Sequence, residues 1–245
     1  MMQRIVAAET LDSLAENDPA AMRSRRDLRR VHRVMGTRSF LLRALRDMMG
    51  TQSTSRSIRI LELGAGDGSL MLGVARVLAP EWRKVEITLL DRQSLVDEAT
   101  IDAYAELGWT ASPKTDDVLD WAAETSCNDR ELARWDMIIV NLFLHHFQGT
   151  QLDALLSAMA TRCDRCFACE PRRARLALVG SHLIGVIGAN AVTRDDAVLS
   201  VRAGFGGNEI TSMWPDVDGW ATQEYPAGVF SHCFRAERIE TIEPR

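Results

Sequence analysis

Three glycines at every second position, preceded by an acidic residue, form the most distinctive chemical pattern of the sequence. In the stretch RILELGAGDGSL, Glu62 stands two places before Gly64, and Asp67 lies between Gly66 and Gly68. Apolar runs on both sides predict a strand, a tight turn and a helix, with the backbone of the turn close to a ligand. Because the loop holds two carboxylates and no lysine, we expect a ligand with a cationic end, not a polyphosphate.

Further acidic residues follow the next two predicted strands. Asp91 ends the stretch VEITLLD, where a carboxylate can accept hydrogen bonds from both hydroxyls of a ribose. Asp116 and Asp117 follow the third strand, where a side chain could accept a hydrogen bond from an adenine amino group. A dinucleotide fingerprint would require glycine where Ser69 stands. The acidic positions therefore predict an adenosine ligand without phosphate and with a cationic amino-acid tail.

On these motifs the chain resembles the class I S-adenosylmethionine-dependent methyltransferases. LELGAGDG is similar to the first motif of that family, LLD to the second, TDDVLDW to the third and WDMIIVNLFLHHF to the fourth. FACEP is similar to the strand that follows the fourth motif. The resemblance covers roughly residues 57–171, and the C-terminal hairpin is similar to the reversed last strand of the family.

The resemblance implies S-adenosylmethionine as the cofactor. Glu62 and the glycine loop would contact its methionine part, Asp91 its ribose, and Asp117 its adenine, with Asp116 as the second choice. The backbone around residues 141–144 would flank the sulfonium. The predicted cofactor-binding residues are Glu62, Gly64, Ala65, Gly66, Asp67, Gly68, Asp91, Arg92, Asp116, Asp117, Val118, Asn141 and Leu142.

Two adjacent histidines, His145 and His146, follow the fourth predicted strand at its carboxyl end, where α/β sheets bind ligands. Methyl transfer to a hydroxyl requires removal of a proton, so either histidine is a candidate catalytic base. The alternative is that a histidine here caps the following helix or packs against the adenosine pocket. Family members with several kinds of acceptor carry the same pair, which therefore does not define the acceptor.

The elements that must position these residues alternate between strand and helix. This alternation predicts βαβ units and a parallel sheet with right-handed crossovers. We expect an α/β fold: a Rossmann-like, mostly parallel seven-stranded sheet with helices on both faces, a C-terminal antiparallel hairpin and an N-terminal helical cap. Residues 1–50 are expected to form the cap and residues 51–245 the methyltransferase domain, with 172–218 as an acceptor-side helical insertion.

The insertion gives the main indication of the acceptor. Its stretch LALVGSHLIGVIGANAV is apolar nearly all round, which predicts burial or contact with an apolar ligand. We therefore expect a small, largely apolar acceptor of aromatic or polyketide type, methylated at oxygen. Alternatively, the insertion packs on the sheet or forms a homodimer interface. Residues 141–144 lack the N/D-P-P-Y/F pattern of enzymes that methylate nucleobases or glutamine.

Three other functions stay open at this point. Carbon methylation of an activated ring needs no strong base, and a non-catalytic protein could use the same cofactor site for regulation. A tRNA or protein methyltransferase could use the arginine-rich helix over residues 23–33. That helix is more simply interpreted as an amphipathic cap with a solvated face.

Composition limits the partners. The chain has 245 residues and a net charge of −5, which gives no footprint for nucleic acid. The first residues lack the apolar core of a signal peptide, and the apolar stretch 176–192 is short for a membrane span. We therefore expect a cytoplasmic protein that binds a small-molecule acceptor and has no membrane span.

Five cysteines are present: Cys127, Cys163, Cys166, Cys169 and Cys233. An odd number without a signal peptide indicates reduced thiols. The run CDRCFAC has the spacing of metal ligands, but no matching Cys or His cluster supplies the rest of a zinc site. We interpret the run as the start of a buried strand and expect no metal at these cysteines.

Overall fold

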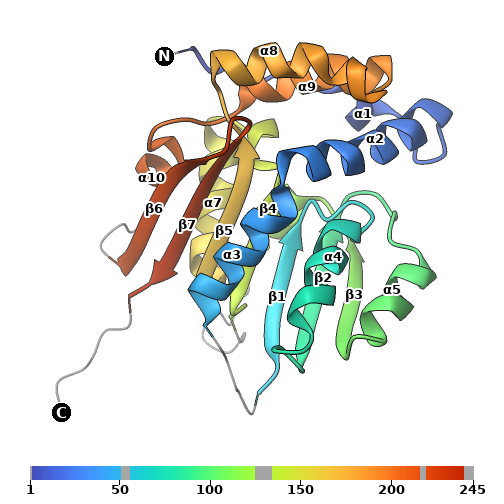
Figure 1. Ribbon diagram of the computed structural model, residues 1–245. Helices are drawn as coiled ribbons and strands as arrows, with labels where there is room; N and C mark the ends of the chain where they lie inside the picture. The colour runs from blue at the N-terminus through green and yellow to red at the C-terminus, as the bar shows by residue number, and fades with distance from the viewer. Residues whose placement is uncertain (1, 51–55, 125–133, 216–218, 240–245) are drawn as a thin grey trace.

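The computed structural model describes residues 2–50, 56–124, 134–215 and 219–239. Its centre is a seven-stranded sheet in the order β3-β2-β1-β4-β5-β7-β6 (Figure 1). The first five strands are parallel, and β7 runs antiparallel to both β5 and β6. The strands are β1 Ile58–Leu63, β2 Val85–Asp91, β3 Trp109–Thr115, β4 Met137–Asn141, β5 Arg165–Pro171, β6 Trp220–Ala227 and β7 Ser231–Arg238. The predicted fold class is confirmed.

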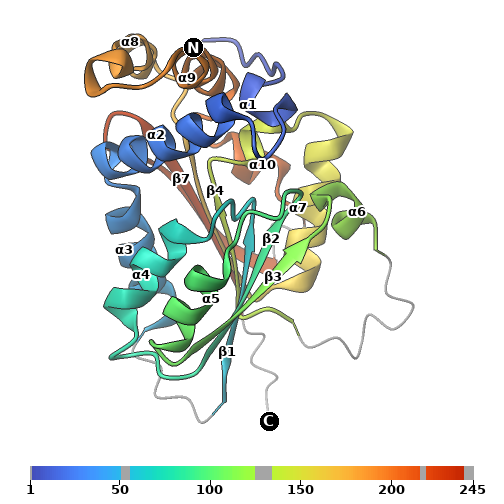
Figure 2. The same ribbon diagram turned by 90° about the vertical axis from the view of Figure 1, so that its right-hand side faces the viewer.

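Helices cover both faces of the sheet (Figure 2). One face carries α3 Thr37–Met49, α4 Ser69–Leu78 and α5 Glu98–Ala105; the other carries α6 Val118–Ala123, α7 Thr150–Arg162 and α10 Glu209–Met213. Each face has its own apolar core. Strand β4 contributes to both because all five of its residues are buried, which accounts for its continuous apolar run MIIV.

A third group of helices lies over the carboxyl ends of the parallel strands (Figure 1). It consists of α1 Thr10–Ser13, α2 Pro19–Met35, α8 Arg175–Leu183, the short 3-10 helix η2 Ile184–Ile187, and α9 Ala191–Ala203. Helix α2 begins at Pro19, because the preceding Asp18 side chain caps it by accepting hydrogen bonds from the N–H groups of Ala20 and Ala21. Within residues 1–50, α1 and α2 form the cap, whereas α3 packs on the sheet.

The insertion forms two helices, and the first of them ends well before its apolar stretch LALVGSHLIGVIGANAV does. Helix α8 ends at Leu183, and after η2 the chain turns at Gly188, whose φ of +83° suits glycine. Asn190 then caps α9, its side chain accepting from the N–H of Thr193. Burial is also only partial, because α8 and η2 expose Leu176, Val179, Leu183 and Val186 by 73%, 57%, 58% and 84%.

The cysteines of CDRCFAC are buried, as the strand interpretation predicts. Cys166 contributes to the core on one face of the sheet and Cys169 to the core on the other face. Two side chains on opposite faces of β5 cannot hold the same metal ion. Cys127 lies outside the described residues. Within the described ranges, none of the helices has the length and apolar character that crossing a membrane requires.

Candidate functional site

A cavity of about 710 Å³ lies at the carboxyl ends of β1, β2 and β4, and residues of α1 and α2 form part of its lining. The structure brings nearly all of the predicted cofactor residues to its wall: Glu62, Gly64, Ala65, Gly66, Asp67, Asp91, Arg92, Asp116, Asp117, Val118, Asn141 and Leu142. Gly68 is the exception. It precedes α4 with a φ of +69°, and its carbonyl accepts a hydrogen bond from the Tyr104 hydroxyl at 3.0 Å.

Glu62 is the most deeply buried acid of this cavity, with 3% of its surface exposed. Its Oε2 atom has no hydrogen-bond partner among the described residues. Burial and the nearby charges of Asp67 and Asp91 raise the pKa of Glu62 well above 4.5. An unpaired buried carboxylate is costly, and a cation placed against it would remove that cost.

Asp91 is tied to the glycine loop. Its Oδ2 accepts a hydrogen bond from the backbone N–H of Gly66 at 2.8 Å, and its Oδ1 accepts from Gln93 N at 3.0 Å. Each carboxylate oxygen keeps a second lone pair, so Asp91 can still accept hydrogen bonds from ligand hydroxyls. The end of β2 thus sets the shape of the loop after β1.

The two acids after β3 have different partners. Asp116 forms an ion pair with Lys114 at 2.8 Å, and this hydrogen bond lowers the pKa of its carboxyl. Asp117 caps α6 by accepting from the N–H of Leu119 at 2.8 Å. Both line the cavity, so the choice between them as the adenine contact stays a prediction.

The arginine-rich helix α2 forms part of the cavity wall. Arg29 pairs with Asp67 at 2.7 Å, and Arg25 donates to the side chain of Gln93 at 2.9 Å. Arg92 donates to the backbone carbonyl of Asp12 in the N-terminal segment. The cap is therefore held over the glycine loop by polar contacts, and not all of its arginines belong to a solvated face.

A second, smaller cavity of about 110 Å³ lies between α2, α8 and α9. Its lining is mainly apolar and includes Val31, Val34, Ala177 and Phe230. Five residues line both cavities and so mark the junction between them: Glu9, Leu11, Leu28, Leu142 and Ser200.

Leu142 stands at this junction with a φ of +49°, the one positive value at a non-glycine residue in the described ranges. Its N–H donates to the carbonyl of Cys169 at 2.9 Å, which holds this conformation. The preceding Asn141 is buried, and its Oδ1 has no hydrogen-bond partner among the residues described. Strained backbone beside an unpaired polar atom is typical of ligand sites.

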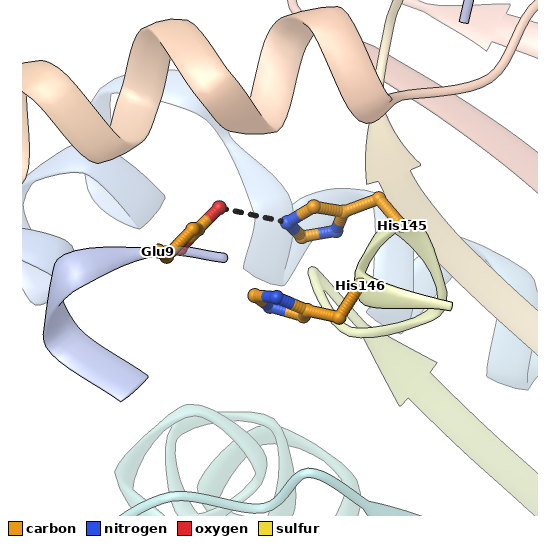
Figure 3. A group of neighbouring side chains, drawn as sticks. All are labelled: Glu9, His145 and His146. Atoms are coloured by element: carbon orange, nitrogen blue, oxygen red, sulfur yellow. Dashed lines mark hydrogen bonds and ion pairs between the residues drawn. The ribbon is translucent and has the colours of Figure 1, made fainter. Parts of the chain in front are cut away.

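His145 lies behind the junction in the 3-10 helix η1 Leu144–His146 and lines neither cavity. Its Nδ1 donates to Glu170 at 2.8 Å, and its Nε2 is 3.3 Å from Glu9 (Figure 3). Burial opposes a charge on the ring, but the bonds to the two carboxylates outweigh it and raise the pKa of His145 to about 9. A histidine that is protonated at neutral pH cannot accept a proton there.

His146 lines the larger cavity, and its Nδ1 is 3.3 Å from Asp12. Burial and the neighbouring charge of His145 lower the pKa of His146 below 6.5. The neutral ring can accept a proton. Geometry therefore favours His146 over His145 as a base, and its catalytic role stays a prediction.

Solved structures of methyltransferases have a similar architecture. A plantazolicin methyltransferase, BpumL, in complex with S-adenosylhomocysteine (SAH) superposes with a TM-score of 0.59 at 13% identity, over 91% of this chain and 92% of that chain. Magnesium protoporphyrin IX methyltransferase (ChlM) from Synechocystis PCC 6803 with bound SAH gives a TM-score of 0.54 at 18% identity, over 87% and 86%. The chain has the class I S-adenosylmethionine-dependent methyltransferase fold. No protein-family model matches the sequence, and no curated protein matches it.

Several site residues of this methyltransferase fold carry no signal in the sequence. Glu9 belongs to no motif, and contacts with α9 hold its segment near His145: Asp196 accepts hydrogen bonds from the N–H groups of Thr10 and Leu11. Glu170 stands in the quoted stretch FACEP, but its role depends on a turn that begins 27 residues earlier. Long-range packing, not local pattern, brings these groups together.

Proposed function

We propose that this protein transfers the methyl group of S-adenosylmethionine to an oxygen atom of a small, largely apolar acceptor. The observation that carries the proposal is the junction at Glu9 and Leu142, where an acid-lined cavity meets an apolar one. A donor in the first cavity and an acceptor in the second would meet at this point. Such positioning is the main work of an enzyme that catalyses methyl transfer.

The acids of the larger cavity support the cofactor. The amino group of S-adenosylmethionine would supply the cation that the unpaired Oε2 of Glu62 lacks, and Asp91 would accept from the ribose hydroxyls. The cofactor supplies an electrophilic methyl group on a sulfonium. The solved plantazolicin and magnesium protoporphyrin IX methyltransferases hold SAH in the same fold.

The smaller cavity supports an apolar acceptor. Its volume of about 110 Å³ is close to one aromatic ring, since a cavity of roughly 150 Å³ binds benzene. A structure of BpumL in complex with a monoazolic desmethylPZN analog and SAH is also similar to this chain. The two superpose with a TM-score of 0.59 at 12% identity, over 88% of this chain and 90% of that chain. An acceptor that presents a ring-sized group to the cavity fits both observations.

An acceptor hydroxyl must lose its proton, and two groups at the junction can assist. The neutral ring of His146 would accept the proton, and the Glu9 carboxylate would orient the hydroxyl. The Ser200 hydroxyl donates to Glu9 and holds that carboxylate in place. His145, fixed by Glu170, would position the turn that carries His146.

Calorimetry with SAH tests the cofactor. We expect the wild-type protein to bind SAH and Asp91→Ala to weaken binding by more than tenfold, because two hydroxyl contacts are lost. Asp102→Ala, on the exposed side of α5, is the matched control and should leave the affinity unchanged. A wild-type protein that does not bind SAH would contradict the proposal.

Phenol, as a ring-sized probe, tests the acceptor. We expect SAH formation to depend on phenol and to fall strongly in Ala197→Phe, which fills the apolar cavity. Val179→Phe on the exposed face of α8 is the control for a larger side chain. Turnover that is equal in Ala197→Phe and the wild type would place the acceptor elsewhere.

A further inference from the structure

Glu9, His145 and His146 gather three potential metal ligands at one point. Each offers a carboxylate oxygen or ring nitrogen, and these three atoms lie within 4.8 Å of one another. Figure 3 shows the two rings side by side, with the Glu9 carboxylate directed at the ring of His145. The ring centroids are 4.2 Å apart. No other cluster of three such groups occurs within the described ranges.

The distance between the Glu9 carboxylate and the His145 ring suits two ligands of one metal ion. Oε1 of Glu9 lies 3.3 Å from Nε2 of His145. In a tetrahedral zinc site with bonds of about 2.0–2.1 Å, neighbouring ligand atoms are roughly 3.3–3.4 Å apart. The same two atoms also accommodate a proton between them, so an experiment must distinguish a metal from a proton.

Outer carboxylates orient both rings as they do in metal sites. Glu170 accepts from Nδ1 of His145 at 2.8 Å, which turns Nε2 toward Glu9. Nδ1 of His146 lies 3.3 Å from Asp12, which can orient the second ring in the same way. Metal-bound histidines almost always donate their second ring N–H to such a partner.

Charge also favours a cation. Three carboxylates, those of Glu9, Asp12 and Glu170, surround two imidazole rings, and the Glu170 side chain is fully buried. With neutral rings, Glu9 and Glu170 would place two negative charges in a largely buried site, whereas the half-exposed Asp12 pairs with Arg92 at 3.5 Å. A divalent ion would offset most of that charge.

We propose that Glu9, His145 and His146 bind one divalent transition-metal ion of the zinc type, with Glu170 and Asp12 as outer partners. Two nitrogens and one carboxylate suit Zn²⁺, Co²⁺ or Ni²⁺ better than Mg²⁺ or Ca²⁺. Three protein ligands leave a fourth position, as in catalytic zinc sites. Because Glu9 and His146 both line the larger cavity, that position lies at its edge.

The site would have two consequences. It would fasten the N-terminal segment that carries Glu9 to the turn after β4, across 136 residues of sequence. It would also lower the pKa of an acceptor hydroxyl in the fourth position, replacing His146 as the group that favours ionisation. The binding claim itself rests on geometry and not on the proposed methyl transfer.

Titration of the EDTA-treated, dialysed protein with Co²⁺ tests the site. We expect one equivalent of Co²⁺ to give visible ligand-field bands, and Zn²⁺ to displace it and raise the melting temperature. Glu9→Gln and His146→Asn should each weaken binding at least tenfold, and Glu170→Gln about 10–100-fold. His182→Asn, an exposed histidine on α8, is the control and should bind as the wild type does.

The results separate the possible outcomes. The proposal would be overturned if Co²⁺ did not bind stoichiometrically, or if neither Glu9→Gln nor His146→Asn weakened its binding. His145 would then be a protonated histidine held between Glu9 and Glu170. Circular dichroism of each variant checks folding. His146→Asn should disturb the fold less than Glu9→Gln, because 20% of the His146 side chain is exposed, against 12% of the Glu9 side chain. SAH binding by the metal-free protein is measured separately, so a failed metal site does not count against the proposed function.

Discussion

Oε2 of Glu170 lies 2.8 Å from Nδ1 of His145, and this contact joins strand β5 to the turn that follows β4. The same carboxylate accepts hydrogen bonds from the backbone N–H groups of Phe143, Leu144 and His145. Because Glu170 is fully buried, these donors take the place of its lost hydration. One side chain thus determines the conformation of the turn beside the proposed site.

Glu170→Gln should therefore destabilise the fold. The amide keeps one oxygen acceptor but turns an NH₂ group toward N–H donors, and it leaves His145 without its anionic partner. Breaking a buried charged pair costs about 3–5 kcal/mol, and we expect a loss in this range from urea unfolding. Glu237→Gln, a partly exposed ion-pair partner of Arg235, should change stability by less than about 1 kcal/mol. Equal effects of the two substitutions would contradict the role of Glu170.

Local patterns predict the part of the site that lies on the sheet. The glycine loop follows β1 and Asp91 ends β2, so strand order alone brings them together. Glu9 is different, because its place depends on Asp196 of α9 and on the whole path of the N-terminal segment. Gly68 is different again: it precedes α4 and does not line the cavity, so its contact with the cofactor stays a prediction.

The insertion shows a second limit. An all-round apolar stretch cannot indicate where a helix ends, and the chain breaks it at Gly188 and starts α9 from Asn190. Asn190 is fixed there by Ser24 and Asp27 of α2, contacts across more than 160 residues. The cap and the insertion therefore determine one another's conformation. A short stretch of sequence cannot reveal this dependence, because the contacting residues are far apart in the chain.

Two glycines of the loop should respond differently to alanine. Both have positive φ, +69° at Gly64 and +56° at Gly66, where an L-residue costs roughly 1–2 kcal/mol. A Cβ on Gly64 would also lie 2.5 Å from the ring of Phe143, whereas one on Gly66 would meet nothing within 4 Å.

We therefore expect Gly64→Ala to destabilise the protein clearly more than Gly66→Ala in thermal unfolding. Gly66→Ala should fold but bind SAH more weakly, because its methyl group would project toward the cavity that Gly66 lines. Equal unfolding temperatures of the two variants would contradict a clash between a Cβ at Gly64 and the Phe143 ring.

His32 should make stability fall in mild acid. Burial lowers the pKa of His32 from 6.5 to about 4. Between these values the unfolded chain binds a proton that the folded protein does not, so this stabilisation is present above pH 6.5 and is lost as the pH falls toward 4. The full loss is on the order of 3 kcal/mol. His32→Gln should flatten this part of the pH profile in urea titrations, and His182→Gln should not.

Glu62→Gln should have opposite effects on stability and on ligand binding. Burial, with the charges of Asp67 and Asp91, raises the folded pKa of Glu62 above 4.5. The stabilisation from this group is therefore present below pH 4.5 and is lost as the pH rises, because the unfolded chain ionises first. A neutral amide avoids this loss, so the variant should be more stable than the wild type at pH 8 and nearly equal at pH 4.

The same substitution removes the carboxylate that would face the cofactor's amino group, so SAH affinity should fall about tenfold, or roughly 1.4 kcal/mol. Glu106→Gln, on an exposed position after α5, should alter neither quantity. If Glu62→Gln were less stable than the wild type at pH 8, the buried Glu62 carboxylate would have a stabilising partner, contrary to this prediction. A variant that is more stable but binds SAH with unchanged affinity would show that the unpaired oxygen has no part in holding the ligand.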